Sequence, residues 1–434
     1  MEMPWGAVSA GGWEPFLRLW SEEWVRAHDH EPEAGRPLEP EVRRRQWLGF
    51  EPATAEQLAA AEARLGRTLP PSLRTFLEVT NGWRDAGCFI YELAGTETLE
   101  WLADTPDAHW ITAYAWADED PAEGEAGLLR RSLRLSLSGD VAVMFLDPDD
   151  VDDRGEWAAY WLSSWSGEGP RRFGSFAALL YDQYASFHAL RRPPGATRDH
   201  WDATVETARL AALDGEVANA LTLLEEAQRF GRPRAGLLRA QLLGMRGRWY
   251  EARVGDLVHP RNAVDGLFES PLFTEELLPL ICFEERLPNS TGNRGLRALR
   301  RLGPPQINEL ADAYLDGSRQ PTFGNPEFDT AVRRILDRLL AEPAFQVPEP
   351  EPVSDAVVVR RSSGIKGAGA PLSPFERQRA AREEQKRLAA AAWPDLAAAL
   401  ELWRPRTADH VAPIALYSHP VLATLLQHGP SRTK

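Results

Sequence analysis

The sequence predicts an α+β domain followed by an all-α region, and three observations lead to this prediction. In the first 192 residues, short segments rich in β-forming residues lie between helical segments. From residue 199 onward, apolar residues recur at helical spacing. Pro193, Pro194 and Gly195 stand between the two patterns, and a chain of 434 residues is long enough for two or three domains.

Residues 13–28 are a predicted amphipathic helix, because aromatic and aliphatic residues recur along one face, beginning with Trp13 and Phe16. Such a helix could bind a membrane or a partner, or it could pack on its own domain. Its polar face is acidic or neutral, whereas a membrane-surface helix needs a basic one, so we favour packing on its own domain. Residues 29–40 are rich in proline, which makes residues 1–40 a Trp-rich helix and connector.

A pair of short helices, joined by a proline turn, follows this connector. Thr54 and Gln57 have the spacing of a capping box, and Gly66 is placed to end the first helix in a left-handed conformation. Pro70–Pro71 suits the first turn of the second helix. Asn81–Gly82 is a turn dipeptide that ends it.

Short segments rich in β-forming residues follow this helix pair. Each is bounded by Gly, Asp or Pro, which predicts strands. Residues 138–140 look like a hairpin turn, and Ser175 is placed to cap a helix over residues 176–190. This order of helices, strands and a helix predicts helices packed on one mostly antiparallel sheet, within a domain of residues 41–192. The predicted strands are residues 88–93, 110–116, 133–137, 141–146 and 157–162.

One spacing pattern runs through the helix pair: Leu65, Gly66, Leu69, Pro70, Phe76, Leu77, Asn81, Gly82 and Trp83. This pattern resembles the SUKH superfamily, also called the Smi/Knr family, and the strand that ends at Asp147–Pro148 continues the resemblance. Leu73 departs from it, since the family has an aromatic residue near that place. The resemblance implies an α+β fold and a non-enzymatic binding role. In bacteria such proteins are often immunity proteins that block a toxin domain, and in fungi they are scaffolds in signalling and wall assembly.

Residues 199–342 are predicted to be tetratricopeptide-like, because small residues repeat with a shift of 32 positions. A generic pair of helical hairpins would give much the same pattern. Residues 343–374 predict a flexible Pro/Gly linker, and residues 375–434 predict a basic helix and an apolar tail that docks back on the body. The related residues are Ala208, Gly215 and Ala220 with Ala240, Gly247 and Ala252.

The formal net charge of −15 argues against nucleic acid or an anionic membrane as the main partner and favours a basic protein. No apolar run approaches the roughly 18 residues of a membrane helix, and the N-terminus lacks the features of a secretory signal. The two cysteines, Cys88 and Cys282, lie far apart, which suits a reducing compartment. We therefore expect a cytoplasmic protein without a cofactor, and the oligomeric state stays open.

Two acidic loops, residues 118–125 and 147–156, are the strongest chemical feature of the sequence. The loop at 147–156 lacks the spacing and the closing glutamate of a calcium-binding EF-hand, and residues 28–30 offer two histidines without a second cluster to complete a metal site. No nucleophile or nucleotide-binding motif is present, so we expect neither a metal nor catalysis. The open alternatives are solvated loops, an acidic face for a basic protein, and an enzyme with two loop carboxylates as acid and base.

We expect this face to bind a basic protein, because a partner's Lys or Arg would relieve the repulsion among its carboxylates. The resemblance implies that this partner protein is a toxin domain. The alternative is a scaffold protein that uses the helical repeats. The predicted partner-binding residues are Asp118, Glu119, Asp120, Asp149, Asp150, Asp152 and Asp153, with Trp116 and Trp157 as exposed aromatic anchors.

Overall fold

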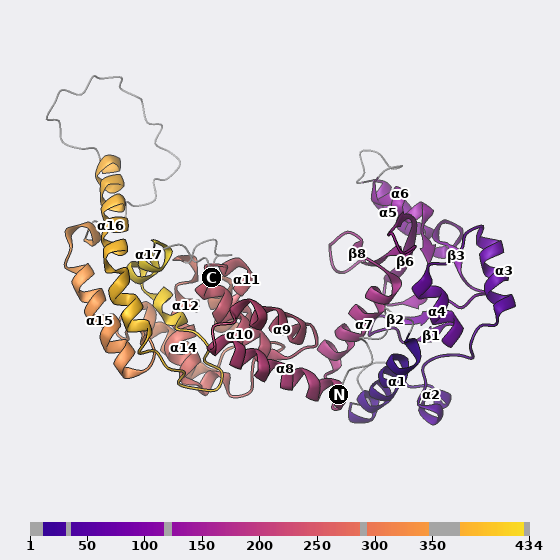
Figure 1. The fold of residues 1–434 in the computed structure, drawn as a ribbon, viewed down its shortest axis with the longest axis horizontal. Helices are drawn as coiled ribbons and strands as arrows, with labels where there is room; N and C mark the ends of the chain where they lie inside the picture. Colours follow the sequence, from indigo (N-terminus) through magenta and orange to yellow (C-terminus); the bar gives the residue numbers. More distant parts are fainter. Residues whose placement is uncertain (1–11, 32–35, 117–123, 287–292, 347–373, 429–434) are drawn as a thin grey trace, which may run out of the picture. The chain divides into compact units, whose positions relative to one another are not determined.

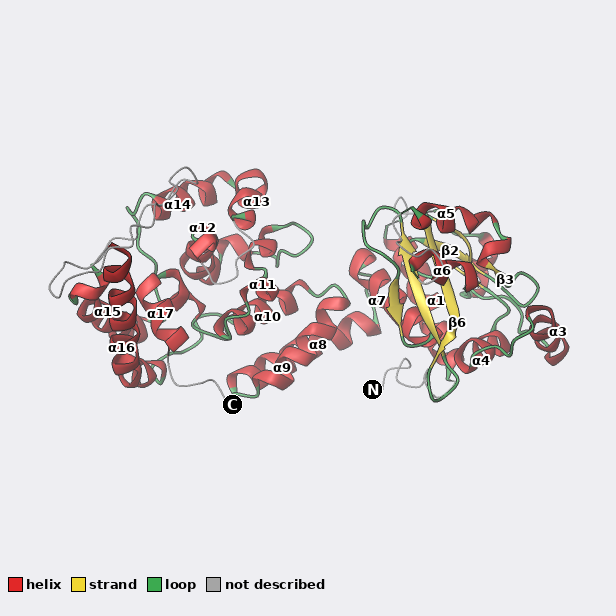
Figure 2. Ribbon diagram, turned by 90° about the horizontal axis from the view of Figure 1, so that it is seen from above, coloured by secondary structure: helices red, strands yellow, loops and turns green. Residues whose placement is uncertain are grey.

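The computed structural model places strands and helices in the first part of the chain (Figures 1 and 2). The chain divides into two compact units, Met1–Thr204 with Glu226–Arg232, and Val205–Glu225 with Pro233–Lys434. The described part of the second unit consists of helices and loops, so the predicted fold class is confirmed. The structure describes residues 12–31, 36–116, 124–286, 293–346 and 374–428.

Helix α1, Trp13–His30, is the predicted amphipathic helix, and it packs within the first unit. The Trp13 ring centroid lies 5.3 Å from that of Phe76, and the Trp20 centroid lies 6.0 Å from that of Trp83. Because these partners belong to the α+β fold, α1 forms part of its core. The predicted domain boundaries stay predictions, and this packing favours a first domain that includes α1.

Helix α2, Pro40–Arg45, leads to the predicted helix pair, α3 at Ala55–Leu65 and α4 at Pro71–Val79. The capping box is confirmed, since the Thr54 hydroxyl accepts the Gln57 N–H and the Gln57 side chain accepts the Thr54 N–H. Two orphan N–H groups at the start of α3 are thereby satisfied.

Two glycines follow these helices with positive φ angles, as predicted. Gly66 ends α3 with a φ of 67°, and Gly82 turns the chain after α4 with a φ of 111°. A Cβ on Gly82 would lie 3.0 Å from the carbonyl oxygen of Leu93, a tight contact, and the positive φ angle also disfavours a side chain, so this turn suits glycine best. The turn delivers the fully buried Trp83 to strand β1, Trp83–Arg84.

The strand pairs are antiparallel, as predicted, but they form two sheets rather than the expected single one. The chain passes between the sheets at Leu135, whose N–H donates to Met144 and whose carbonyl accepts from Ala94. The first sheet contains, in spatial order, β1, β2 (Ile90–Leu93) and β5 (Ser136–Gly139). The second contains β3 (Glu100–Trp101), β4 (Leu133–Arg134), β6 (Ala142–Val151), β7 (Trp157–Ser163) and β8 (Arg171–Phe173).

The predicted strand at residues 110–116 is wrong, because these residues form helix α5, His109–Ala115. Their β-forming composition misled the prediction. Trp110, Ile111 and Tyr114 pack instead from one helical face onto the second sheet, and tertiary packing overrides strand propensity. The buried cluster contains Leu102, Trp110, Leu129, Val143, Phe145, Ala158, Tyr160 and Leu162.

Helix α7, Phe176–Arg191, lies against β7, and Ser175 caps it as predicted by accepting the N–H of Ala178. Successive strand residues face opposite sides of a sheet. Tyr160 faces the cluster under α5, so the neighbouring Trp161 faces α7. The second sheet is thus covered on both faces. The remaining short elements here are α6 (Glu125–Arg131) and 3₁₀-helices at Leu102–Asp104 and Pro106–Ala108.

Helices α8 to α11 keep the predicted shift of 32 positions only in part: it separates the starts of α9 and α11, at Val217 and Trp249, but not those of α8 and α10, at Ala196 and Pro233. Gly215, with a φ of 87°, and Gly247, with a φ of 73°, occupy the turns of the two helix pairs. The second pair is unequal, because its last helix has only 4 residues. The tetratricopeptide-like assignment therefore stays a prediction. These helices are α8 (Ala196–Leu213), α9 (Val217–Arg229), α10 (Pro233–Met245) and α11 (Trp249–Ala252).

The rest of the second unit is helical, and α16 runs on through Pro394, beyond the predicted end of the basic helix at residue 392. Its elements are a π-helix at Leu272–Leu277, α12 (Leu278–Cys282), α13 (Arg294–Leu302), α14 (Pro305–Leu315), α15 (Pro326–Leu340), α16 (Pro374–Leu400) and α17 (Pro420–His428). Its 3₁₀-helices are Val254–Val258, Leu267–Glu269, Glu284–Arg286, Pro343–Phe345 and Ile414–Ser418.

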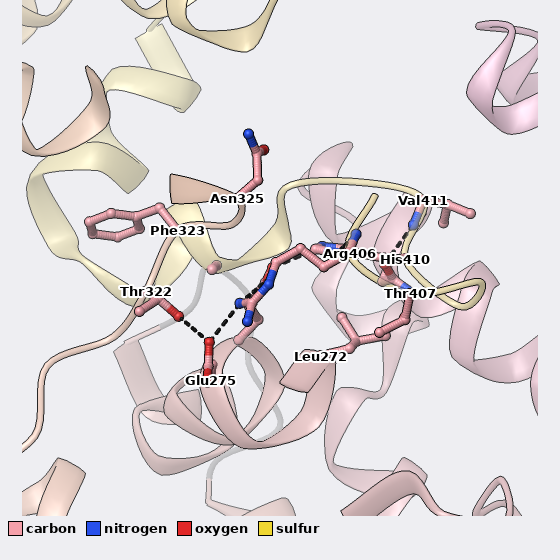
Figure 3. A network of polar contacts seen from close by, with 12 residues as sticks. Leu272, Glu275, Thr322, Phe323, Asn325, Arg406, Thr407, His410 and Val411 are labelled. Carbon is pink, nitrogen blue, oxygen red and sulfur yellow. Dashed lines mark hydrogen bonds and ion pairs between the residues drawn. The ribbon is translucent and has the colours of Figure 1, made fainter. Parts of the chain in front are cut away.

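The C-terminal residues pack within this unit, where α17 lies against α16 and α15. Figure 3 shows the polar network that holds residues 406–411, the segment between α16 and α17. Arg406 donates to the Glu275 carboxylate at 2.6 Å, and the Thr322 hydroxyl donates to the same oxygen at 3.0 Å. Glu276 and His410 lie 2.9 Å apart, both fully buried.

Candidate protein-binding site

The predicted acidic loop at 147–156 is mostly strand. Residues 147–151 continue β6, which pairs with β7 from Asp147 opposite Ala158 to Val151 opposite Trp157. Of the predicted partner-binding residues, Asp118, Glu119 and Asp120 lie outside the described residues. Asp149, Asp150, Asp152 and Asp153 lie at the end of β6 and in the turn to β7.

Arginine side chains neutralise the carboxylates at the end of β6. The buried Asp147 carboxylate accepts two hydrogen bonds from Arg131, at 2.8 and 2.6 Å. Asp150 likewise accepts two from Arg172, at 2.6 and 2.8 Å, and this bidentate bond is the main cause that lowers the pKa of Asp150. Asp149 lies 3.3 Å from an Arg67 nitrogen. The prediction that these carboxylates repel one another until a partner neutralises them is therefore wrong for Asp147, Asp149 and Asp150.

Asp152 organises the turn to β7. Its carboxylate accepts the N–H groups of Arg154 at 2.8 Å and of Glu156 at 3.0 Å, and the Glu156 hydrogen bond is the main cause that lowers the pKa of Asp152. Glu156 in turn accepts the N–H and the hydroxyl of Ser72, at 2.8 and 2.6 Å, at the start of α4. Asp153 is exposed and has no ion pair within the described part of the chain.

The two predicted aromatic anchors differ. Trp116 is 90% exposed at the end of α5, as the prediction requires. Trp157 is only 6% exposed, so its predicted role as a surface anchor is wrong. The reason is that both faces of β7 are covered, so the residues that point to either side of this strand are buried.

The sequence prediction missed an aromatic pocket of about 230 Å³ between β7, the loop to β8 and α7. Trp165 in this loop is 53% exposed, and its ring centroid lies 4.9 Å from that of Phe89. Trp161 completes the aromatic wall, 6.3 Å from Phe89. The signal available in the sequence was a tryptophan within the Ser/Gly-rich segment 164–170, where no periodic core pattern accounts for it.

The loop that carries Trp165 is fixed to the turn between β5 and β6. The Trp165 indole N–H donates to the carbonyl of Asp140 at 3.2 Å, and the Ser164 N–H donates to Val141 at 3.1 Å. Val141 has a φ of 47°, a left-handed conformation that is costly for a β-branched residue. This valine is also 57% exposed, so the strained turn contributes apolar surface beside the Trp165 loop.

A second, polar pocket of about 200 Å³ lies beside β1 and β2. Arg84 pairs with Glu39 at 3.0 Å, and Arg36 stacks over the Tyr91 ring at 4.4 Å. Burial raises the pKa of Asp85 in this pocket to about 6, although Arg36 opposes the shift. The pocket carries both signs of charge and gives no preference for one ligand charge.

A buried cluster around Glu23 joins α1, α7 and α8. The Glu23 carboxylate accepts the Tyr184 hydroxyl at 2.5 Å, His188 Nε2 at 2.9 Å, and the Thr197 hydroxyl and N–H at 3.0 and 3.2 Å. Burial favours a higher pKa for Glu23, but the hydrogen bond and charge of His188, with the other donors, lower it overall. This cluster is closed off from solvent, so we assign it to structure.

The comparisons with known proteins give one match. Residues 52–182 match the model of the SMI1/KNR4 family (SUKH-1), which supports the resemblance to the SUKH superfamily. No curated protein and no solved structure matches the chain. Within the described ranges, no group of three or more His, Cys, Asp or Glu side chains is placed to hold a metal ion. None of the described helices combines the length and apolarity needed to span a membrane.

Proposed function

We propose that the first unit is a protein-binding module of the SUKH type, and that it acts as an immunity protein by binding and blocking a basic toxin domain in the cytoplasm. The family match at residues 52–182 is the observation that carries this proposal. The net charge of −15 supports a basic partner, because charge complementarity speeds association. Trp116, 90% exposed, adds a candidate anchor, since aromatic residues often dominate interface energetics.

A titration of toxin activity tests this proposal. The genes next to this chain are first searched for a large secreted protein with a variable C-terminal domain, and that domain is then assayed with increasing amounts of the full-length protein. A blocking protein should abolish activity at an endpoint of one molecule per toxin domain. Loss of activity at far lower ratios would indicate enzymatic inactivation, and undiminished activity at excess protein would refute the proposed immunity role.

A scaffold role for the second unit is the second candidate function. It is favoured by apolar side chains exposed on the repeat-like helices, namely Leu210 at 50% and Tyr250 at 68%. Scattered exposed apolar residues are common on soluble proteins, so this evidence is weaker than the family match. A partner that binds equally well to the Leu210→Ser and Tyr250→Ser double variant would refute the use of this surface.

A further inference from the structure

We propose that the Trp165 pocket receives an arginine side chain of the basic protein partner. The inference rests on the proposed function and specifies the chemistry that the partner presents. Phe89, Trp161 and Trp165 form an aromatic wall, and Trp165 leaves about half of its surface in solvent. A guanidinium is planar, weakly hydrated and stacks on indole faces better than an ammonium does.

The charged groups around the pocket favour a cationic ligand. Arg171 lines the pocket, but it already binds Asp182 at 2.9 Å and stacks over Phe173 at 4.8 Å. Asp182 is shared with Arg229 at 3.1 Å. Glu168, also in the lining, is exposed and has no ion pair within the described part of the chain. The unpaired charge of the lining is therefore negative.

An unused polar group points to a ligand independently of this charge. Ser163 lines the pocket at the end of β7, is only 3% exposed, and its hydroxyl has no hydrogen-bond partner among the described residues. A buried hydroxyl without a partner costs roughly 1–3 kcal/mol, so an unpaired one beside a pocket calls for a ligand that can bond to it. The several N–H donors of a guanidinium can serve Ser163 and Glu168 together.

The test uses the full-length protein labelled with 5-fluorotryptophan and short glycine peptides as probes. The peptides contain one arginine, one lysine or one citrulline, the last being an uncharged isostere of arginine. Fluorine NMR then follows the Trp165 resonance, assigned with the Trp165→Phe variant. The Trp116 resonance, assigned in the same way, is the matched control, because Trp116 is exposed but does not line this pocket.

The arginine peptide should shift the Trp165 resonance saturably and leave that of Trp116 in place. Citrulline should bind on the order of tenfold more weakly, because it lacks the cation–π attraction and the charge-assisted bonds. Glu168→Gln should weaken arginine binding roughly three- to tenfold, and Ser163→Ala should weaken it by a smaller factor. The exposed position of Glu168 makes its variant safe for folding.

Three results would overturn the inference: no shift of Trp165, equal shifts with arginine and citrulline, or equal shifts with arginine and lysine. These titrations need no partner protein. If the titrations fail, arginine binding at this pocket is refuted, but the first unit would still be proposed to bind a protein through another face. Failure of the toxin titration, in contrast, would remove the proposed function itself.

Discussion

The Glu23→Gln substitution should destabilise the first unit, because its carboxylate accepts more hydrogen bonds than an amide can. One carboxylate oxygen accepts from Tyr184, His188 and the Thr197 hydroxyl, and the other accepts the Thr197 N–H. Glutamine has one acceptor oxygen, and its NH₂ group must face a donor in either orientation.

The cost follows from these bonds. A buried donor left without an acceptor costs roughly 1–3 kcal/mol, and loss of the stronger charge-assisted bonds adds about 1 kcal/mol. We therefore expect a loss of about 2–4 kcal/mol, which lowers the melting temperature of a unit of this size by roughly 4–16 °C. The control is Glu22→Gln, on the next, exposed residue of α1, which should change the melting temperature little.

The effect should also depend on pH. The pKa of Glu23 is below its usual value of 4.5 in the folded protein, so its contribution to stability is fully present above pH 4.5 and is lost as the pH falls through the folded pKa. Hydrogen exchange is measured for peptides from α1 and α7, with peptides from the second unit as the internal reference. Faster exchange in α1 and α7 alone would show that the stability loss is confined to the first unit. Wild-type exchange and melting in Glu23→Gln at pH 7 would refute the structural role of this cluster.

Three further substitutions test other parts of the fold. Gly82→Val should lower the melting temperature, because the residue has a φ of 111° and its new Cβ would press on the backbone; a wild-type melting curve would show that the turn tolerates a side chain. Asp147→Asn should cost about 1–3 kcal/mol in chemical unfolding, because it removes the bidentate, charge-assisted bonds from the partly exposed Arg131, whereas the exposed Asp153→Asn should cost little. Asp85→Asn should stabilise the protein by about 1–2 kcal/mol at pH 8, since the raised pKa of Asp85 makes its charged form unfavourable once the pH rises through about 6. Equal gains at pH 4 and pH 8 in thermal unfolding would contradict this titration.

The helix pair α3 and α4 could be predicted in detail because its signals are local. Thr54, Gln57 and Gly66 act within a few residues of themselves, and capping bonds and left-handed turns need no distant partner. Helix α5 could not be predicted, since its aromatic residues suit a strand equally well and only the sheet beneath them decides.

The candidate site was predicted less well than the fold. The sequence predicts an unpaired acidic loop for the carboxylates from Asp147 to Asp152. Their arginine partners could not be predicted, because these lie up to 82 residues away in sequence, as Arg67 does from Asp149. The pocket at Trp165 brings together residues as distant as Phe89 and α7. Such convergence depends on the tertiary fold, so spacing along the chain cannot show it.

The central claim is that the first unit binds the partner, and hydrogen exchange of the complex with the toxin domain found in the gene-neighbourhood search tests it most directly. Peptides of the full-length protein are compared with and without the toxin domain. We expect protection within residues 52–182, including the loop 164–170 that carries Trp165. Protection confined to residues 205–225 and 233–434, or no protection at toxin concentrations that saturate inhibition, would contradict the account.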